Sequence, residues 1–245
     1  MDNKKIFDNY LTGHYSKCEK TNFNSEEEVL TLLKRNKAPI DYNLKQFFEA
    51  RIDKKNNILD LGCGYGSFLY FLQSHRYENV TGVDISTEEV RICKKLFKTY
   101  QFHQEDIFEY VYNTKEKFDV IYLSHVLEHV KKDQIFEFLQ DVKNILTDDG
   151  YFIIVVPNSA AYFNAAANRY GDLTHEIGFT EISLSQLLMV AEFSDIEIRN
   201  YFGVGNVILN VLRKATLFVF EILIQILGYE KQNTYTPSIL VIVRK

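Results

Sequence analysis

A glycine-rich loop that follows an acidic residue is the feature of this sequence with the clearest chemical meaning. The stretch 58–66 reads ILDLGCGYG, an apolar run that ends in three closely spaced glycines. Glycines after a strand let the backbone turn sharply and approach a bound molecule closely. A dinucleotide-binding loop prefers G-x-G-x-x-G, because the pyrophosphate then sits at a helix N-terminus. Here Ser67 takes the place of the third glycine and Asp60 would repel a pyrophosphate, so the loop suits a ligand with positive charge.

Two more acidic residues follow the next two expected strands. Asp84 ends the second strand, where a carboxylate can accept hydrogen bonds from both hydroxyls of a ribose. Asp106 follows the third strand, within the sequence QEDI, and can accept a hydrogen bond from an adenine amino group. S-adenosylmethionine joins an adenosine to an ammonium and a sulfonium, so it matches this set of acids.

The order of these motifs resembles the class I S-adenosylmethionine-dependent methyltransferase superfamily. The resemblance covers roughly residues 57–201 and rests on D-x-G-x-G-x-G, the strand-end acid and the D-I pair. It implies S-adenosylmethionine as the cofactor, with S-adenosylhomocysteine as its product. The positions that it implies as cofactor contacts are Asp60, Gly62, Cys63, Gly64, Gly66, Asp84, Ile85, Asp106, Ile107, Leu123, Ser124 and His125.

The segment after the fourth expected strand, LSHVLEHV at 123–130, contains two histidines. In the superfamily this loop flanks the methionine part of the cofactor. His125 and His129 are four positions apart, so they share a face if the segment is helical. Such a pair is too small a ligand set for a metal ion, and we predict no metal site. We expect His125 in the pocket and a weaker role for His129.

The segment after the fifth strand is expected to recognise the acceptor of the methyl group. It spans about 25 residues before the next clear helix, a length that usually marks a functional loop. The part RYGDLTHEIGFT at 169–180 resembles methyltransferases of bacterial capsule and O-antigen gene sets, in which D-x-x-H precedes a serine-capped helix. We predict His175 as the general base, oriented by Asp172 or Glu176. An alternative is that Asp172 and His175 only pin the loop.

Further acceptor contacts are expected around this segment. They are Tyr15, His129, Asn158, Arg169, Tyr170 and Glu176. An acceptor that is already an oxyanion, such as a phosphate or phosphoramidate, needs no base. Arg169 and the histidines would then act as charge clamps.

The elements that must position these residues alternate between strands and helices. Strands are expected at 58–61, 80–83, 100–103, 118–123, 151–156, 196–201 and 239–243, with a turn at 148–150. Apolar strands joined by helices predict parallel pairs with both faces covered. The expected fold class is α/β: a Rossmann-like, doubly wound, seven-stranded and mostly parallel sheet, whose last strand is antiparallel as in the superfamily.

We divide the chain into an N-terminal helical cap, 1–55, and a class I methyltransferase domain, 56–245. The cap is expected to hold two helices, one after a capping box at 25–28 and one at about 41–51. Within the domain, 157–182 is the acceptor loop and 204–229 an apolar helical insertion. The insertion is too often interrupted by polar residues to span a membrane. It can cover the sheet or pocket, form a homodimer, or lie on a membrane surface.

Bulk properties exclude some partners. The net charge of −5 and the lack of a Lys/Arg run disfavour nucleic acid. Three widely spaced cysteines form no disulfide or zinc pattern, and the N-terminus has no apolar signal segment, so we expect a cytoplasmic protein.

The predicted function is O-methylation of a sugar hydroxyl, or of a phosphate or phosphoramidate group, on a capsular or surface polysaccharide precursor. Three alternatives stay open. A methyltransferase for a small lipid or quinone would show a long apolar pocket. A dinucleotide-dependent oxidoreductase is disfavoured by Ser67 and Asp60. A non-catalytic partner of a glycosyltransferase would bind the cofactor without turnover.

Overall fold

A single sheet in the order β3-β2-β1-β4-β5-β7-β6 forms the centre of the molecule. The computed structural model describes residues 26–203, 207–228 and 233–245. The strands within them are β1 (Ile58–Leu61), β2 (Val80–Asp84), β3 (Gln101–Gln104), β4 (Phe118–Ser124), β5 (Leu146–Pro157), β6 (Ser194–Tyr201) and β7 (Ser238–Arg244). Strands β1 to β5 pair in parallel, and β7 runs antiparallel between β5 and β6. This confirms the predicted Rossmann-like sheet and its antiparallel last strand.

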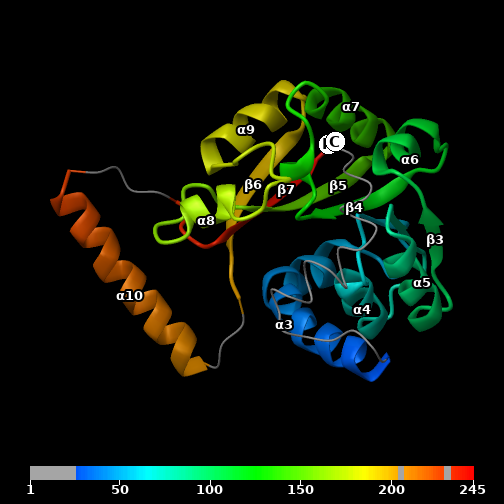
Figure 1. The fold of residues 1–245 in the computed structure, drawn as a ribbon, viewed down its shortest axis with the longest axis horizontal. Coiled ribbons are helices and arrows are strands. Elements are labelled where there is room, and N and C mark those ends of the chain that lie inside the picture. Colours follow the sequence, from blue (N-terminus) through cyan, green and yellow to red (C-terminus); the bar gives the residue numbers. More distant parts are fainter. Residues whose placement is uncertain (1–25, 204–206, 229–232) are drawn as a thin grey trace.

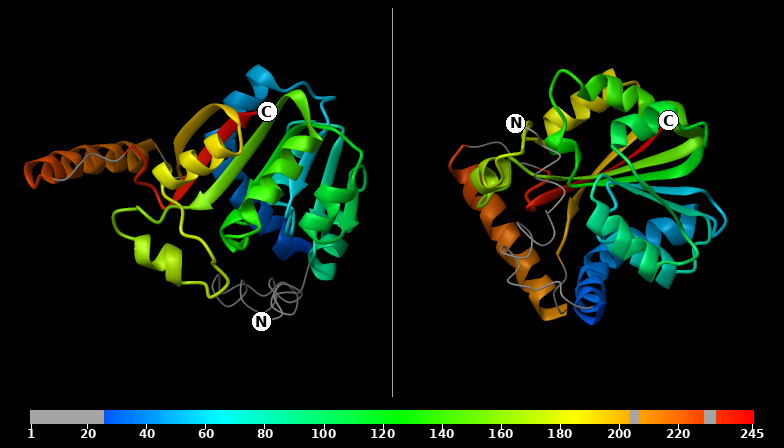
Figure 2. Two further views of the ribbon diagram at one scale, coloured as in Figure 1. Left: turned by 90° about the horizontal axis from the view of Figure 1, so that it is seen from above. Right: turned by 45° about the vertical axis from the view of Figure 1, so that its right-hand side comes forward.

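Helices cover both faces of the sheet (Figures 1 and 2). One face carries α6 (Ile107–Asn113), α7 (Ile135–Ile145) and α9 (Glu181–Val190), and the other carries α3 (Glu26–Arg51), α4 (Ser67–Ser74) and α5 (Thr87–Leu96). Successive residues of β1 enter opposite cores: Leu59 and Leu61 join the first layer, and Ile58 joins the second. Since both faces are buried, the strands read as continuous apolar runs.

The N-terminal cap differs from the prediction of two helices. Within the described residues, α3 is one helix of 26 residues that continues through Pro39. Leu33, Ile40 and Leu44 are buried in one core on either side of the proline. This continuous apolar face offsets the roughly 3 kcal/mol that an internal proline costs a helix. The predicted capping box includes Ser25, which lies outside the described residues.

The predicted turn at 148–150 is also corrected, because these residues belong to β5. The pairing between β4 and β5 shifts register between Phe118 and Val120, which pair with Leu146 and Tyr151. Such an irregularity absorbs extra residues without ending the strand. Strand β5 therefore starts at Leu146, before the apolar run predicted at 151–156.

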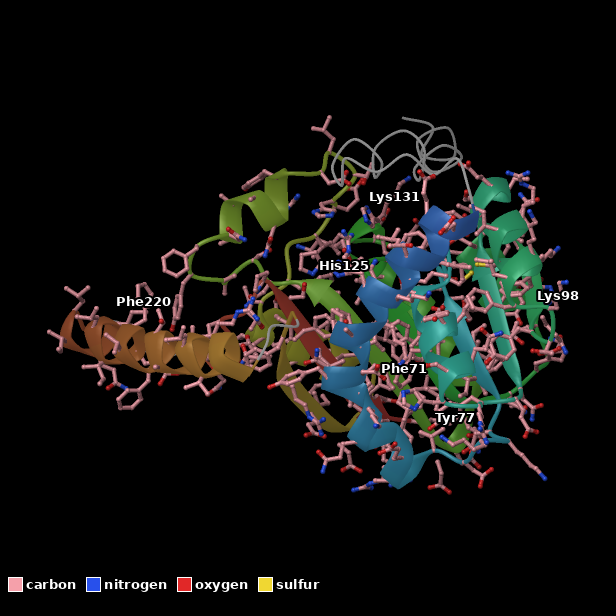
Figure 3. The ribbon with its side chains drawn as sticks, turned by 90° about the horizontal axis from the view of Figure 1, so that it is seen from below. Phe71, Tyr77, Lys98, His125, Lys131 and Phe220 are labelled. Atoms are coloured by element: carbon pink, nitrogen blue, oxygen red, sulfur yellow. The ribbon has the colours of Figure 1, made fainter. Side chains whose placement is uncertain are left out.

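The apolar insertion forms α10 (Val207–Ile226), which stands away from the sheet (Figures 1 and 2). Its Phe220 ring contacts the rings of Tyr162 and Phe163 at centroid distances of 5.0 and 5.1 Å (Figure 3). Val211, Phe218 and other apolar side chains of the helix are exposed. The helix therefore does not cover the sheet, which was one of the three expectations. A search of the described helices finds none with the length and apolarity to cross a membrane.

Candidate active site

The glycine loop lies between β1 and α4, at the carboxyl edge of the sheet, and its backbone is held by β2. Gly62, Gly64 and Gly66 have φ of 79°, 51° and 95°, the left-handed region in which glycine has no steric penalty. The amide nitrogen of Gly62 donates to the carbonyl oxygen of Val83 at 2.8 Å. The Gly64 amide donates to Oδ2 of Asp84 at 2.8 Å. The predicted acid of β2 thus organises the loop.

The three glycines serve different purposes. A Cβ at Gly62 would come within 2.5 Å of Val126, and one at Gly66 within 2.5 Å of the Phe97 ring. These two positions let protein segments pack against the loop. A Cβ at Gly64 would have only Glu89 Oε1 within 4 Å, at 3.7 Å. Gly64 is therefore the glycine that leaves space for a bound molecule.

Three buried carboxyl groups surround this loop: Asp60, Asp84 and Glu89. Asp60 is 3% exposed, and its Oδ2 has no hydrogen-bond partner among the described residues. Burial raises the pKa of Asp60 well above its usual range, and the neighbouring charge of Asp84 raises it further. Burial also raises the pKa of Glu89, with Asp84 again adding to the effect. A site with this much acid repels phosphate and fits the sulfonium and ammonium of S-adenosylmethionine.

Asp84 itself combines two roles. Its Oδ1 accepts from the Ser86 amide at 2.9 Å, which supports the start of α5. A carboxylate oxygen has two lone pairs, so both oxygens can still accept ribose hydroxyls. Burial raises the pKa of Asp84, and the hydrogen bonds from Ser86 and Gly64 oppose that rise.

The other expected cofactor contacts lie at the same edge. Asp106 follows β3 and caps α6, because its Oδ1 accepts from the Phe108 amide at 2.8 Å. The remaining expected contacts are all buried or half-buried. Cys63 and Leu123 are buried, Ile85 and Ser124 are half-buried, and Ile107 packs on the core. A hydrogen bond with the Cys93 thiol is the main cause that raises the pKa of Cys63, so this thiol is an inert part of the loop.

The turn after β4 holds His125 at φ 56°, an uncommon backbone conformation for a residue other than glycine (Figure 3). Its Nδ1 lies 3.4 Å from Oε1 of Glu128. The chain then forms a short 3₁₀ helix, η2 (Leu127–His129). The predicted helical pair of His125 and His129 is therefore wrong, since His125 precedes the helix.

His129 instead meets the acceptor loop. Its Nδ1 lies 2.8 Å from Oγ1 of Thr174, and that hydroxyl donates to Oδ1 of Asp172 at 2.6 Å. The rings of His129 and His175 are 4.8 Å apart, edge to face. Burial lowers the pKa of His129, and the neighbouring His175 lowers it further. The negative charge of Glu128 opposes this lowering of the pKa of His129.

The orientation of His175 differs from the prediction. Its Nδ1 donates to the backbone carbonyl of Asn168 at 2.8 Å, so neither Asp172 nor Glu176 holds the ring. This hydrogen bond leaves the lone pair of His175 on Nε2. Asp172 acts on His129 through Thr174 instead.

Other expected acceptor contacts turn out to shape the loop. Asn158 is fully buried and donates to the carbonyls of Thr234 and Thr236, so it is not available to a substrate. The Arg169 guanidinium donates to the carbonyls of His175 and Glu176, at 2.6 and 3.1 Å. This use of its donors opposes the predicted role of Arg169 as a charge clamp.

The last expected acceptor contacts remain compatible with binding or lie outside the structure. Tyr170 and the side chain of Glu176 are exposed at the same loop. Tyr15 lies outside the described residues.

A cavity of about 360 Å³ lies between this loop and the ends of β4, β5 and β7. It is lined by His125, Asp172, His175, the α8 (Ala165–Tyr170) segment around Asn168, Pro157 and residues 237–238. A second cavity, of about 400 Å³, lies at the amino ends of β1 and β2. Of these two cavities, the first borders His125 and His175 at the carboxyl edge of the sheet.

Three residues of the site escaped the sequence interpretation: Glu89, Glu128 and Thr174. Glu89 lies in the first turn of α5, the helix that follows Asp84. Glu128 is an acid between apolar residues in VLEHV, which is a signal for a buried charge. Thr174 carries no sequence signal, because its role depends on contact with His129.

Sequence comparisons agree with this geometry. A family model described as "Methyltransferase domain" matches residues 32–198. N-methyltransferase 4 of Papaver somniferum is 29% identical over 113 residues, which cover 44% of this chain and 31% of that protein. A ubiquinone biosynthesis O-methyltransferase of Actinobacillus pleuropneumoniae is 33% identical over 123 residues, 47% of this chain and 50% of that protein. The chain thus spans no more than half the length of these relatives.

Solved structures share the fold. A SAM-dependent methyltransferase from Archaeoglobus fulgidus aligns with a TM-score of 0.63 and 21% identity, over 85% of this chain and 94% of that chain. The plantazolicin methyltransferase BpumL in complex with SAH aligns with a TM-score of 0.59 and 16% identity, over 99% and 95%. The family match confirms the expected cofactor and shows that the oxidoreductase alternative is wrong. Because the family model covers more than half of its length, this chain belongs to the methyltransferase domain family.

Proposed function

We propose that the protein transfers the methyl group of S-adenosylmethionine to an oxygen atom of a polar acceptor. The observation that carries the proposal is the buried, hydrogen-bond-deficient carboxyl group of Asp60 beside the glycine loop. Together with Asp84 and Glu89, it makes this edge of the sheet a receptor for positive charge. The histidine-lined cavity lies at the neighbouring strands, where an acceptor can meet the cofactor.

The donor half of the site binds and orients the cofactor. S-adenosylmethionine, when bound, supplies a methyl group on a positively charged sulfur. Asp84 would accept hydrogen bonds from the ribose hydroxyls and Asp106 one from the adenine amino group, and Gly64 gives the backbone room for close approach. Asp60 balances the positive charge of the methionine part.

The acceptor half is the cavity beside His175. The acceptor oxygen forms a bond to the methyl carbon while the carbon–sulfur bond breaks and its electron pair stays on sulfur. The proton of a hydroxyl acceptor passes to Nε2 of His175, whose lone pair is set by the hydrogen bond from Nδ1. An acceptor that is already an oxyanion needs no such transfer.

We propose a sugar hydroxyl, phosphate or phosphoramidate group of a capsular or surface polysaccharide precursor as the acceptor. Four polar side chains in the lining of the cavity, those of Asp172, Asn168, His125 and His175, support a hydrophilic acceptor. The resemblance of the segment 169–180 to capsule and O-antigen methyltransferases points the same way.

A quinone precursor is the second candidate. It is favoured by the similarity to the ubiquinone biosynthesis O-methyltransferase, which reaches 33% identity. Against it stand the charged and polar side chains of Asp172, His125 and His175 in the lining of the acceptor cavity.

We further propose that α10 docks on an apolar partner, either a membrane that carries a lipid-linked acceptor or a second copy of the chain. The exposed apolar side chains of the helix support this proposal. Sedimentation velocity tests the dimer, and cosedimentation with anionic vesicles tests the membrane.

A labelled-methyl assay separates the acceptors. The purified chain is incubated with methyl-labelled S-adenosylmethionine and four acceptors: sugar nucleotides, glycan fragments, phosphoramidate-bearing sugars and a catechol. Label in a carbohydrate supports the main proposal, and label only in the catechol overturns it in favour of the quinone precursor. Binding of S-adenosylhomocysteine without transfer to any acceptor would support the non-catalytic alternative.

His175→Ala tests the acceptor half separately. We expect loss of turnover with unchanged S-adenosylhomocysteine affinity in calorimetry. His103→Ala is the matched control, since His103 lies on β3, away from the cavity. Unchanged turnover of His175→Ala would remove His175 from the mechanism.

A further inference from the structure

Three side chains with the chemistry of metal ligands converge beside the acceptor cavity. Glu128 and His129 come from η2, and His175 comes from the acceptor loop. One ligand atom from each of the three lies within 4.8 Å of the others. The backbone holds the two segments together, because the amides of Glu176 and Ile177 both donate to the carbonyl oxygen of Glu128.

The burial of Glu128 is the strongest sign that something else binds here. Its side chain is 2% exposed, yet neither carboxyl oxygen has a hydrogen-bond partner in the part of the chain that the structure describes. A buried carboxylate is strongly unfavourable unless it is paired or binds a metal. His125 lies 3.4 Å from one oxygen, but this side chain is half exposed and compensates the charge only when protonated.

The hydrogen bonds of the two imidazoles leave one ring nitrogen of each with a lone pair. His175 Nδ1 donates to the Asn168 carbonyl, so its lone pair is on Nε2. His129 Nδ1 donates to Thr174 Oγ1, because that hydroxyl gives its own hydrogen to Asp172. The lone pair of His129 is then also on Nε2. A carboxylate or carbonyl behind each ligating histidine is the usual second layer of a metal site.

We propose that Glu128, His129 and His175 bind one divalent transition-metal ion beside the acceptor cavity. Two imidazole nitrogens and one carboxylate suit Zn²⁺, Mn²⁺ or Fe²⁺, whereas Mg²⁺ and Ca²⁺ prefer oxygen ligands. Ligands of a tetrahedral zinc lie about 3.4 Å apart, so the group closes by roughly 1 Å on binding. The spacing of His125 and His129 predicted no metal site, and this proposal differs from that prediction.

The cation deepens the proposed function, and this consequence rests on that function. Three protein ligands leave a coordination position for an oxygen of the acceptor. The cation lowers the pKa of a bound hydroxyl, or neutralises a bound phosphate. With the metal bound, His175 would be a ligand instead of the base proposed for the metal-free site, and the exposed ring of His125 at the cavity would receive the proton.

Metal binding is measured on the full chain after treatment with a chelator and dialysis. Calorimetry with Zn²⁺ should show one site per chain, and Co²⁺ should give the visible bands of a protein-bound ion. Glu128→Gln and His129→Gln should abolish the site, whereas His103→Gln should keep it. Thr174→Val should weaken binding about 10- to 100-fold through loss of the second layer, and Thr174→Ser should restore it.

S-adenosylhomocysteine binding, measured on the same samples, reports folding of the variants and tests the donor half. If the parent chain binds S-adenosylhomocysteine but no stoichiometric metal, the metal proposal is overturned while the proposed function stands. Metal binding without methyl transfer to any acceptor would support the metal site and refute the proposed methyl transfer. Metal binding that survives Glu128→Gln and His129→Gln would also overturn this ligand assignment. Loss of the site only in His125→Ala would assign the metal to other residues.

Discussion

The buried carboxyl group of Asp60 leads to a sharp prediction: Asp60→Asn stabilises the cofactor-free protein. The substitution keeps the shape of the side chain and removes its charge. In the parent, Oδ2 is buried without a hydrogen-bond partner among the described residues, and Asp84 adds a second negative charge nearby. Removing a buried, unsatisfied charged group relieves about 2 kcal/mol. For a domain of this size that corresponds to a rise in Tm of roughly 4–8 °C.

The pH dependence gives this prediction its sign. The folded-state pKa of Asp60 is raised by burial first and by Asp84 second. Between the unfolded and the folded pKa, the folded state therefore binds more protons, and the parent loses stability as the pH rises. Below about pH 4 the carboxyl is protonated in both states, so parent and variant should unfold alike. Above the folded pKa the advantage of Asp60→Asn should be complete.

The cofactor should reduce this advantage. If Asp60 balances the positive charge of S-adenosylmethionine, its loss removes a charged interaction of about 1.5–3 kcal/mol, or roughly 10- to 150-fold in affinity. At about 100 times the parent's Kd, the cofactor adds about 2.7 kcal/mol to the parent, whereas a variant that binds tenfold more weakly gains only about 1.4 kcal/mol.

Thermal unfolding from pH 4 to pH 8, with and without cofactor, measures both effects. Asp133→Asn is the control, because Asp133 is exposed. A lower Tm for Asp60→Asn at pH 8, or a difference from the parent that stays constant with pH, would refute the argument that Asp60 is an uncompensated buried charge.

Three further substitutions test the packing that supports the site, by urea denaturation. Gly66→Ala should cost about 1–3 kcal/mol more than Gly64→Ala, because only its Cβ would meet a ring, that of Phe97 at 2.5 Å; equal losses would show that φ alone decides. Thr180→Ala removes the capping box of α9 and should cost about 1 kcal/mol, and no change would show that the cap is redundant. Phe71→Ala empties a fully buried position and should cost about 3–5 kcal/mol (Figure 3), whereas a loss below 1 kcal/mol would mean that the core collapses around it.

The sheet was predictable because its signals are local. The central parallel strands β1, β4 and β5 contain apolar runs, and the glycines and Asp84 mark strand ends by their own residue types. The two misplaced boundaries have non-local causes. Pro39 is tolerated in α3 because both flanks pack on one core, and β5 starts early because β4 pairs with it across a register shift.

The acceptor half was less predictable because it is built from contacts between distant segments. His129 and Thr174 are 45 positions apart in sequence, and nothing in either segment encodes their hydrogen bond. The loop geometry also decides which carboxylate serves which histidine. Asp172 accepts a hydrogen bond from Thr174, and His175 donates to the backbone carbonyl of Asn168. The residue types therefore predicted which side chains belong to the site, but their hydrogen-bond partners depend on the fold.

The two hydrogen-bond-deficient carboxyl groups, Asp60 and Glu128, suggest why the halves of the site belong together. Asp60 lies in β1 and Glu128 follows β4, the neighbouring strand in the sheet, and each lowers the stability of the free protein. Each is compensated when positive charge binds: the methionine part of the cofactor at Asp60 and the proposed cation at Glu128. An acceptor oxygen between these two positive centres is held most strongly when it carries negative charge. A phosphate, a phosphoramidate or an alkoxide formed at the cation therefore fits the site better than a neutral amine.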